Sequence, residues 1–274
     1  MADNRPIGVF DSGLGGLTVL RELEKEMPNE NFVYFGDTSR VPYGSKSNAT
    51  IRQYALQDEK FLLSKNVKYI IAACGTVSAV ASDTAKELPV KFMGVVENTA
   101  RDAVNTTKTK KIGVIGTTAT INNKAYEKYI SKLCPEAEVT SVDCPLFVPL
   151  VEAGWIEKDD IVVRKTAERY LTTIIQKKVD TLILGCTHYP VLSEVIGDIM
   201  GESVTLINAG VTTAKAVKAE LKSLDLLNDS TNKPKRALYV SDKTSSFSKV
   251  AKILLGGEVD EQSVEPQEAV RLSE

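Results

Sequence analysis

The sequence predicts an α/β protein of two lobes related by a pseudo-twofold axis. Each lobe is expected to be a mainly parallel sheet flanked by helices, with the active site in the cleft between them. Short apolar runs alternate with longer amphipathic segments along nearly the whole chain, and one order of motifs occurs twice. Strands that are buried on both faces and separated by helices are typical of parallel sheets. A chain of 274 residues is also long enough for two compact lobes.

Strands are predicted where a short run is almost continuously apolar, and helices where apolar residues recur at i, i+3 and i+4. The helical spacing is clear at Leu17, Leu20 and Leu23, and again over residues 161–175. The predicted strands are residues 6–10, 31–35, 67–73, 90–95, 111–115, 138–143, 181–184, 204–207 and 236–240.

Two pairs of matching segments indicate an internal repeat. Residues 7–12 match residues 112–117, and each segment is an opening strand that ends in a small polar loop. Residues 69–76 match residues 181–187, and each is a later strand that ends in a cysteine. Generic strands often look alike, but here both pairs follow the same order at nearly the same spacing. We therefore interpret the two halves of the chain as related lobes.

The repeat also predicts where the lobes divide. The second lobe is expected to span residues 98–210 and to carry Cys186. Residues 211–274 contain a helix, a polar loop, a strand and a final helix. We expect this last part to return and, together with residues 1–97, to complete a first lobe that carries Cys74.

Composition and charge exclude several classes of protein. With 34 basic and 36 acidic residues, the net charge of −2 gives no basic surface for nucleic acid. No apolar stretch approaches the roughly 20 residues that span a bilayer, and the first residues carry no signal-peptide core. We therefore expect a cytoplasmic protein that acts on a small-molecule substrate, away from membranes and nucleic acids. In that reducing compartment, chemistry or packing explains the four cysteines better than disulfides.

Cys74 and Cys186 stand just beyond the carboxyl ends of predicted strands, where open parallel sheets bind their ligands. Small hydroxyl residues follow each of them, Thr76 after the first and Thr187 after the second. We expect the start of the next helix to lower the pKa of such a thiol. A single buried cysteine is more often a small apolar side chain. Two cysteines at equivalent positions of a repeat favour a chemical function.

His188 is the only histidine and lies two residues beyond Cys186. It could share a proton with that thiol or bind an anionic ligand. No metal site is predicted, because Cys186-Thr187-His188 has neither a Cys-x-x-Cys pair nor a second histidine beside it. Cys134 and Cys144 each precede a proline and lack hydroxyl neighbours, so both are predicted to pack.

The loop of residues 11–16 joins a predicted strand to a helix. Its glycines and the helix start could form an anion nest suited to a carboxylate. It is not a dinucleotide fingerprint, because Thr18 stands at the third glycine position. Asp11 would repel an anion and suits an ammonium group or a proton relay. The loop of residues 41–44 is either an ordinary turn or a second part of the site.

Two thiols that face one cleft from opposite lobes suit a particular kind of chemistry. One base reaches only one face of a stereocentre, whereas two acid/base groups can remove a proton from one face and return one to the other. Sulfurs placed roughly 3–3.5 Å from the reacting carbon would be about 6–7 Å apart, too far for a disulfide. Nothing in the sequence indicates a pyridoxal site. Preorganised hydrogen-bond donors and exclusion of water must then stabilise the carbanion.

The chain resembles the glutamate racemases of the Asp/Glu racemase superfamily over nearly its whole length. The first and last of the matching motifs are together highly specific for that family. The motifs are Phe10-Asp11-Ser12-Gly13-Leu14-Gly15-Gly16, Tyr34-Phe35-Gly36-Asp37, Pro42-Tyr43-Gly44, Ala73-Cys74, Thr76, Pro149-Leu150-Val151-Glu152-Ala153-Gly154 and Gly185-Cys186-Thr187-His188-Tyr189-Pro190.

The resemblance implies an isomerase that needs no cofactor, forms a homodimer, and makes D-glutamate for peptidoglycan and hence for cell wall biogenesis and cell shape. Cys74 and Cys186 would be the acid/base pair, assisted by Asp11, Glu152 and His188. The implied substrate-binding residues are Asp11, Ser12, Pro42, Tyr43, Gly44, Gly75, Thr76, Thr187 and His188.

Position 75 departs from the family pattern, which has Asn-Thr after the first cysteine where this chain has Gly75-Thr76. A missing hydrogen bond to a charged substrate group costs on the order of 1.5–3 kcal/mol. We therefore predict a weakened but genuine racemase. Two alternatives remain open at this point: a racemase of aspartate or a related amino acid, and a binding or regulatory protein whose catalysis is impaired.

Overall fold

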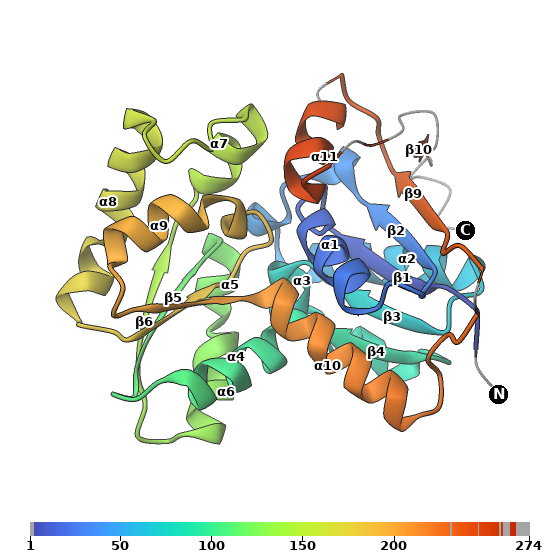
Figure 1. Cartoon of the computed structure of the whole chain (residues 1–274), viewed down its shortest axis with the longest axis horizontal. Helices are drawn as coiled ribbons and strands as arrows, with labels where there is room; N and C mark the ends of the chain where they lie inside the picture. The colour runs from blue at the N-terminus through green and yellow to red at the C-terminus, as the bar shows by residue number, and fades with distance from the viewer. Residues whose placement is uncertain (1–2, 231, 246, 258, 260–263, 267–274) are drawn as a thin grey trace.

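The computed structural model describes residues 3–230, 232–245, 247–257, 259 and 264–266 and contains two parallel sheets side by side (Figure 1). We call the part built on the six-stranded sheet the first lobe and the part built on the four-stranded sheet the second lobe. The strands of the first sheet are β1 (Ile7–Asp11), β2 (Phe32–Gly36), β3 (Tyr69–Ala72), β4 (Lys91–Gly94), β9 (Arg236–Val240) and β10 (Val264–Pro266). Those of the second are β5 (Lys111–Gly116), β6 (Glu138–Asp143), β7 (Thr181–Leu184) and β8 (Thr205–Asn208).

The strand order places the two cysteine loops at the carboxyl ends of corresponding strands in the two sheets. The first sheet runs β10-β9-β2-β1-β3-β4 and the second β6-β5-β7-β8, and all the pairs are parallel. Phe10 pairs with Ala72, so the loop that begins at Asp11 lies beside the loop that carries Cys74. The equivalent neighbours β5 and β7 bring residue 117 beside Cys186 in the second lobe.

The predicted fold class is confirmed, and each predicted strand is present with ends that differ by two residues at most. The sequence missed β10, whose three residues include Glu265 and Pro266 and give no apolar run. Its residue Val264 pairs with Leu238 at the outer edge of the first sheet.

Helices cover both sheets, and two of them join the lobes (Figure 1). α4 and α10 run side by side at the junction, and α10 also packs on α1. The predicted lobe boundaries, after residues 97 and 210, fall in the first turns of these two helices, and they stay a prediction. The helices are α1 (Leu17–Glu26), α2 (Asn48–Ser64), α3 (Gly75–Val80), α4 (Val95–Thr106), α5 (Thr118–Asn123), α6 (Ala125–Leu133), α7 (Phe147–Ala153), α8 (Ile161–Gln176), α9 (Ser193–Met200), α10 (Ala209–Ser223) and α11 (Phe247–Leu255), with short 3-10 turns η1 (Thr38–Arg40), η2 (Tyr43–Ser45), η3 (Thr84–Glu87) and η4 (Tyr189–Leu192).

One hydrophobic core extends through both lobes. Val9 and Ile71 of the first sheet belong to the same buried cluster as Leu182 and Leu184 of the second. A continuous core holds the lobes in a defined relation, because close-packed interiors deform little. The floor of the cleft between the lobes is therefore firmly supported.

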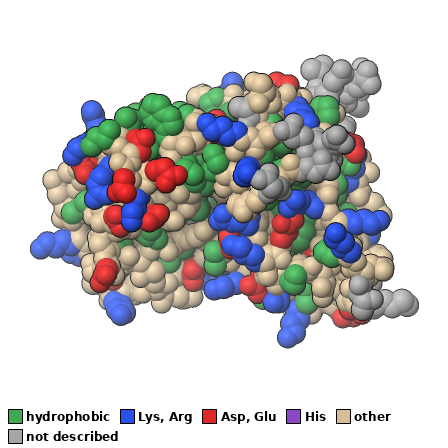
Figure 2. Space-filling view, turned by 45° about the horizontal axis from the view of Figure 1, so that its top comes forward, with side chains coloured by type: hydrophobic (Ala, Val, Ile, Leu, Met, Phe, Trp, Pro, Cys, Tyr) green, Lys and Arg blue, Asp and Glu red, His purple; other side chains and the backbone are tan. Residues whose placement is uncertain are grey.

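The surface carries one conspicuous gathering of apolar side chains. Figure 2 shows them at the upper left, over α7 and α8. Leu146, Trp155, Ile161 and Val162 are all exposed there.

Among the described residues, none of the helices combines the length and the apolar character needed to cross a membrane.

Candidate active site

A cavity of about 680 Å³ opens between the carboxyl ends of the two sheets. Both cysteines singled out from the sequence line it, Cys74 from the first lobe and Cys186 from the second. Both are free thiols. The first lobe contributes residues 12–13, 41–45 and 74–76, and the second contributes 117–118, 144–145, 148–149, 152 and 185–189.

Cys74 precedes the first residue of α3, and its side chain is buried. Its Sγ donates a hydrogen bond to Ser12 Oγ at 3.4 Å. Burial, and next the negative charge of Asp11, raises the pKa of the Cys74 thiol to about 12. The expected lowering of this pKa is therefore wrong, because desolvation of the thiolate and a nearby carboxylate outweigh the start of a short helix. Cys74 rests as a thiol at neutral pH.

Asp11 ends β1 and is almost completely buried. Its Oδ2 accepts a hydrogen bond from the Gly13 N–H at 3.0 Å, and its Oδ1 accepts a longer one, 3.5 Å, from Thr187 Oγ1 of the second lobe. Burial raises the pKa of Asp11, while the charge of His188 opposes that shift. Asp11 thus reaches from the surroundings of Cys74 to the second lobe.

Cys186 follows β7 and has a cationic neighbour. His188 Nδ1 lies 3.9 Å from Cys186 Sγ, and His188 Nε2 lies 3.1 Å from Glu152 Oε1 on α7. Burial tends to lower the pKa of His188, but hydrogen bonds to Cys186 and Glu152 together raise it to about 10. The imidazole is therefore protonated at neutral pH, and its positive charge lies beside the sulfur of Cys186.

Gly15 allows the glycine loop to touch the second lobe. A β-carbon on Gly15 would lie 2.2 Å from Thr187 Oγ1 and 2.5 Å from the ring of His188, so only glycine fits there. The nearby Thr18 Oγ1 donates a hydrogen bond of 2.7 Å to the Thr187 carbonyl. The loop thus packs against Thr187 and His188 of the second lobe, and its expected role as an anion nest stays a prediction.

Tyr43 lines the cavity, but its hydroxyl points away from it. The hydroxyl hydrogen-bonds to Asp37 Oδ2 and lies 3.2 Å from Asp58 Oδ2, and the side chain is almost fully buried. The Tyr43 hydroxyl is therefore already engaged by the two carboxyls.

A hydroxyl cluster crosses between the lobes. Thr76 Oγ1 lies 3.0 Å from Thr117 Oγ1, which in turn lies 3.0 Å from Thr120 Oγ1. Thr117 and Thr118 also line the cavity, although neither was predicted from the sequence. The internal repeat could have identified Thr117, because Thr117 matches Ser12 in the two opening segments.

The lobes also meet closely at two glycines, Gly75 and Gly185. A β-carbon on Gly75 would lie 2.5 Å from the carbonyl oxygen of Gly185. Gly185 has no space for a side chain either, since its own β-carbon would lie 2.7 Å from the Ile115 carbonyl. The space that a side chain at position 75 needs is thus filled by the second lobe.

The other two cysteines lie in different surroundings. Cys144 is fully buried in the core shared by the lobes and also forms part of the cavity wall, where burial raises the pKa of its thiol. Cys134 follows the end of α6 and is partly exposed. Each has an acidic neighbour, Asp143 near Cys144 and Glu136 near Cys134, and Cys134 lies outside the cavity.

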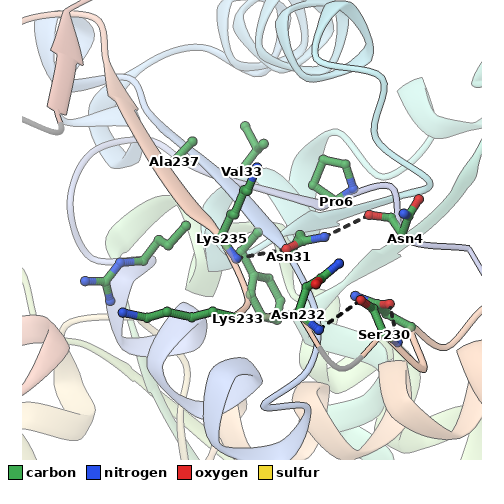
Figure 3. A pocket seen from close by; sticks show the side chains of 12 residues that line it. Asn4, Pro6, Asn31, Val33, Ser230, Asn232, Lys233, Lys235 and Ala237 are labelled. Carbon is green, nitrogen blue, oxygen red and sulfur yellow. Dashed lines mark hydrogen bonds between the residues drawn. The ribbon is translucent and has the colours of Figure 1, made fainter.

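A second cavity, of about 740 Å³, lies at the opposite edge of the first sheet, where β2 and β9 begin (Figure 3). Asn31 there donates to the Asn4 carbonyl and accepts from the Lys235 N–H, both at 2.8 Å. Its amide thus holds the surrounding segments together. Of the described residues that line this cavity, none is a cysteine, a histidine or an acid. The cleft with two thiols is therefore the candidate active site.

The chain is similar to known proteins over most of its length. The profile of the Asp/Glu/hydantoin racemase family matches residues 7–217. The glutamate racemase of Geobacter metallireducens is 43% identical over 256 residues, which cover 93% of this chain and 94% of that protein.

Two solved structures share the fold over almost the full length. The crystal structure of glutamate racemase from Francisella tularensis in complex with D-glutamate has a TM-score of 0.89 and 40% identity, and the match covers 97% of this chain and 98% of that one. An isoform of glutamate racemase from Bacillus anthracis has a TM-score of 0.91 and 35% identity with the same coverage.

Proposed function

The chain belongs to the Asp/Glu/hydantoin racemase family, and from this membership we propose that it interconverts L- and D-glutamate, with one of Cys74 and Cys186 removing the Cα proton and the other supplying a new one. One observation carries the proposal. Two free thiols from different lobes line one cavity, and each has its own ionisable neighbour, Asp11 for the first and His188 for the second.

Inversion at Cα requires two proton transfers, one at each face of the substrate. The thiolate of one cysteine takes the Cα proton from one face of the substrate, and the thiol of the other cysteine delivers a proton to the opposite face. Asp11 assists Cys74, and His188, oriented by Glu152, assists Cys186. When the reaction runs in the opposite direction the two thiols exchange parts, so configuration inverts either way.

The protein's own groups take the place of a cofactor in this proposal. Hydroxyl and backbone N–H groups around the cavity stabilise charge on the substrate where water is excluded. The substrate-binding residues carried over from the family are Asp11, Ser12, Pro42, Tyr43, Gly44, Gly75, Thr76, Thr187 and His188. Since the Tyr43 hydroxyl is held by carboxyls, Tyr43 contributes through its main chain.

The wider context follows from the family. D-Glutamate made here supplies peptidoglycan, and hence cell wall biogenesis and cell shape, in the cytoplasm. The working unit is a homodimer whose subunits each have lobes of residues 1–97 with 211–274, and 98–210. Sedimentation of the purified protein at micromolar concentration tests the dimer, and a monomer that is fully active would contradict it.

The direct test is purified protein with L-glutamate in deuterium oxide. Circular dichroism follows racemisation, and proton NMR follows deuterium uptake at Cα. We expect both in the unaltered protein and in the matched control Cys134→Ser, and loss of racemisation in Cys74→Ser and Cys186→Ser. A folded protein that neither racemises nor exchanges glutamate would overturn the proposal, and turnover of aspartate instead would reassign the substrate.

A further inference from the structure

A buried polar cluster stands behind the cavity wall formed by residues 41–45. The Tyr43 hydroxyl lies between the carboxyls of Asp37 and Asp58. The Arg40 guanidinium bonds to both acids, through Nε to Asp37 and through Nη2 to Asp58 at 3.1 Å. These four side chains form what we call the Tyr43 clamp, and none of its polar groups is needed for the chemistry proposed above.

One face of α2 supplies the rear of the clamp. Tyr54, Gln57 and Asp58 have the i, i+3 and i+4 spacing that brings side chains together on a helix. The Tyr54 ring lies 5.3 Å from the ring of Tyr43, and the Arg40 guanidinium lies 4.1 Å above Tyr54. Gln57 accepts a hydrogen bond from Arg40. Helix α2 is thus joined to the cavity wall through aromatic and polar contacts.

The clamp contains two acids but only one guanidinium, so a proton on one of the acids balances its charges. Asp37 and Asp58 are fully buried and face a single guanidinium. The Tyr43 hydroxyl has one hydrogen, which it donates to Asp37. A second hydrogen bond, between the Tyr43 oxygen and Asp58, therefore needs a proton on Asp58. Burial, and next the charge of Asp37, raises the pKa of Asp58 well above its usual range. A protonated Asp58 donates to the Tyr43 oxygen, whereas a charged Asp58 accepts from the Tyr43 hydroxyl at 3.2 Å.

The wall held by the clamp touches the second lobe. A β-carbon on Gly44 would lie only 3.2 Å from Thr117 Cβ. Thr117 in turn is hydrogen-bonded to Thr76, next to Gly75. A displacement of residues 41–45 would therefore alter the cavity wall in both lobes.

We propose that Asp58 is a positioning residue for the active site, acting through Tyr43 to hold the wall of residues 41–45 against Thr117. The proposal rests on the racemase function proposed above. Asp58 lies outside the residues that line the cavity, so its effect on the reaction passes through the clamp. Loss of the clamp weakens substrate binding more than it slows the chemical step.

The experiment compares Asp58→Ala with the conservative Asp58→Asn, whose amide can still donate to the Tyr43 oxygen. We expect KM for glutamate to rise on the order of tenfold in Asp58→Ala, the loss typical of a broken hydrogen-bonded contact, with kcat changed less than threefold or so. In Asp58→Asn, KM should stay within about twofold of the parent. Equal effects of the two variants, or a fall in kcat at constant KM, would overturn the proposal.

A double-mutant cycle tests whether Asp58 acts through Tyr43. Tyr43→Phe removes the hydroxyl, so adding Asp58→Ala to it should raise KM no further, whereas independent effects would multiply. Hydrogen exchange of the amides of residues 41–46 gives a readout that needs no substrate. It should be faster in Asp58→Ala than in the parent, and unchanged exchange contradicts the clamp. Absence of racemisation in the parent would instead contradict the proposed function.

Discussion

The carbonyl oxygen of Gly185 lies 2.5 Å from the place where a β-carbon on Gly75 would stand. Side chains do not approach backbone oxygen so closely. The Gly185 backbone is also held in place, because its N–H donates a hydrogen bond of 2.7 Å to the Ile115 carbonyl. Any side chain at position 75 therefore pushes the lobes apart at the cleft. Glycine at position 75 therefore lets the two lobes approach closely. It also lacks the hydrogen bond that an asparagine side chain would give the substrate.

Introducing the family's asparagine separates the two effects. Gly75→Ala adds only the β-carbon, so we expect a loss of about 1–3 kcal/mol of stability from overpacking and a lower kcat/KM for glutamate. Gly75→Asn adds the same β-carbon and an amide that can bind the substrate. Urea unfolding and initial-rate kinetics on both variants check this. A kcat/KM for Gly75→Asn above that of the parent would mean that the lobes yield easily.

The thiol of Cys74 should respond to the charge of Asp11. Because its pKa is about 12, alkylation of Cys74 by iodoacetamide should rise about tenfold per pH unit from pH 7 to 9. Asp11→Asn removes a charge that disfavours the thiolate, so alkylation at pH 8 should become faster while racemisation falls. Mass spectrometry of the Cys74 peptide measures the rate, with the exposed Asp198→Asn as control. Slower alkylation in Asp11→Asn would contradict this electrostatic account.

The pair of His188 and Glu152 should make stability depend on pH. The pKa of His188 is about 10 in the folded protein, above the ordinary value of 6.5. The contribution of its charged form is thus complete below pH 6.5 and is lost as pH rises toward 10. In Glu152→Gln the pKa of His188 is lower, so the loss should end at a lower pH. Unfolding by urea at several pH values checks it, and identical profiles for the two proteins would refute it.

A buried ion pair should support the opposite end of the first lobe. Lys68 Nζ lies 2.7 Å from Glu30 Oε2 and also donates to the carbonyls of Asp3 and Leu226, and the Lys68 side chain is fully buried. Lys68→Met leaves the Glu30 charge uncompensated and should cost about 3–5 kcal/mol. The double variant with Glu30→Gln should recover part of this loss in urea unfolding. A double variant no more stable than Lys68→Met would show that the pairing of charges is unimportant.

Much of the fold could be predicted because the apolar runs mark buried parallel strands directly. The ends of β6, β7 and β9 agree with the sequence, and β9 lies between the polar residues Lys235 and Ser241. β10 could not be predicted, because a three-residue edge strand depends on its partner β9 and not on a pattern of its own.

The site could be predicted only in part, for a similar reason. Cys74 and Cys186 were identified from their positions in the repeat, and the structure brings both to one cavity. The pKa of Cys74 could not be judged from its neighbours in the chain, because burial depends on the whole fold. The orientation of the Tyr43 hydroxyl depends on Asp58, which is brought to it by a separate helix.

The unequal surroundings of the two thiols have a consequence for the kinetics. Mirror-image substrates have equal free energies, so kcat/KM must be the same in both directions whatever lies beside each sulfur. The neighbours of Cys74 and Cys186 can therefore raise or lower kcat/KM only for both enantiomers together. Any advantage of one enantiomer in kcat is then matched by the same factor in KM.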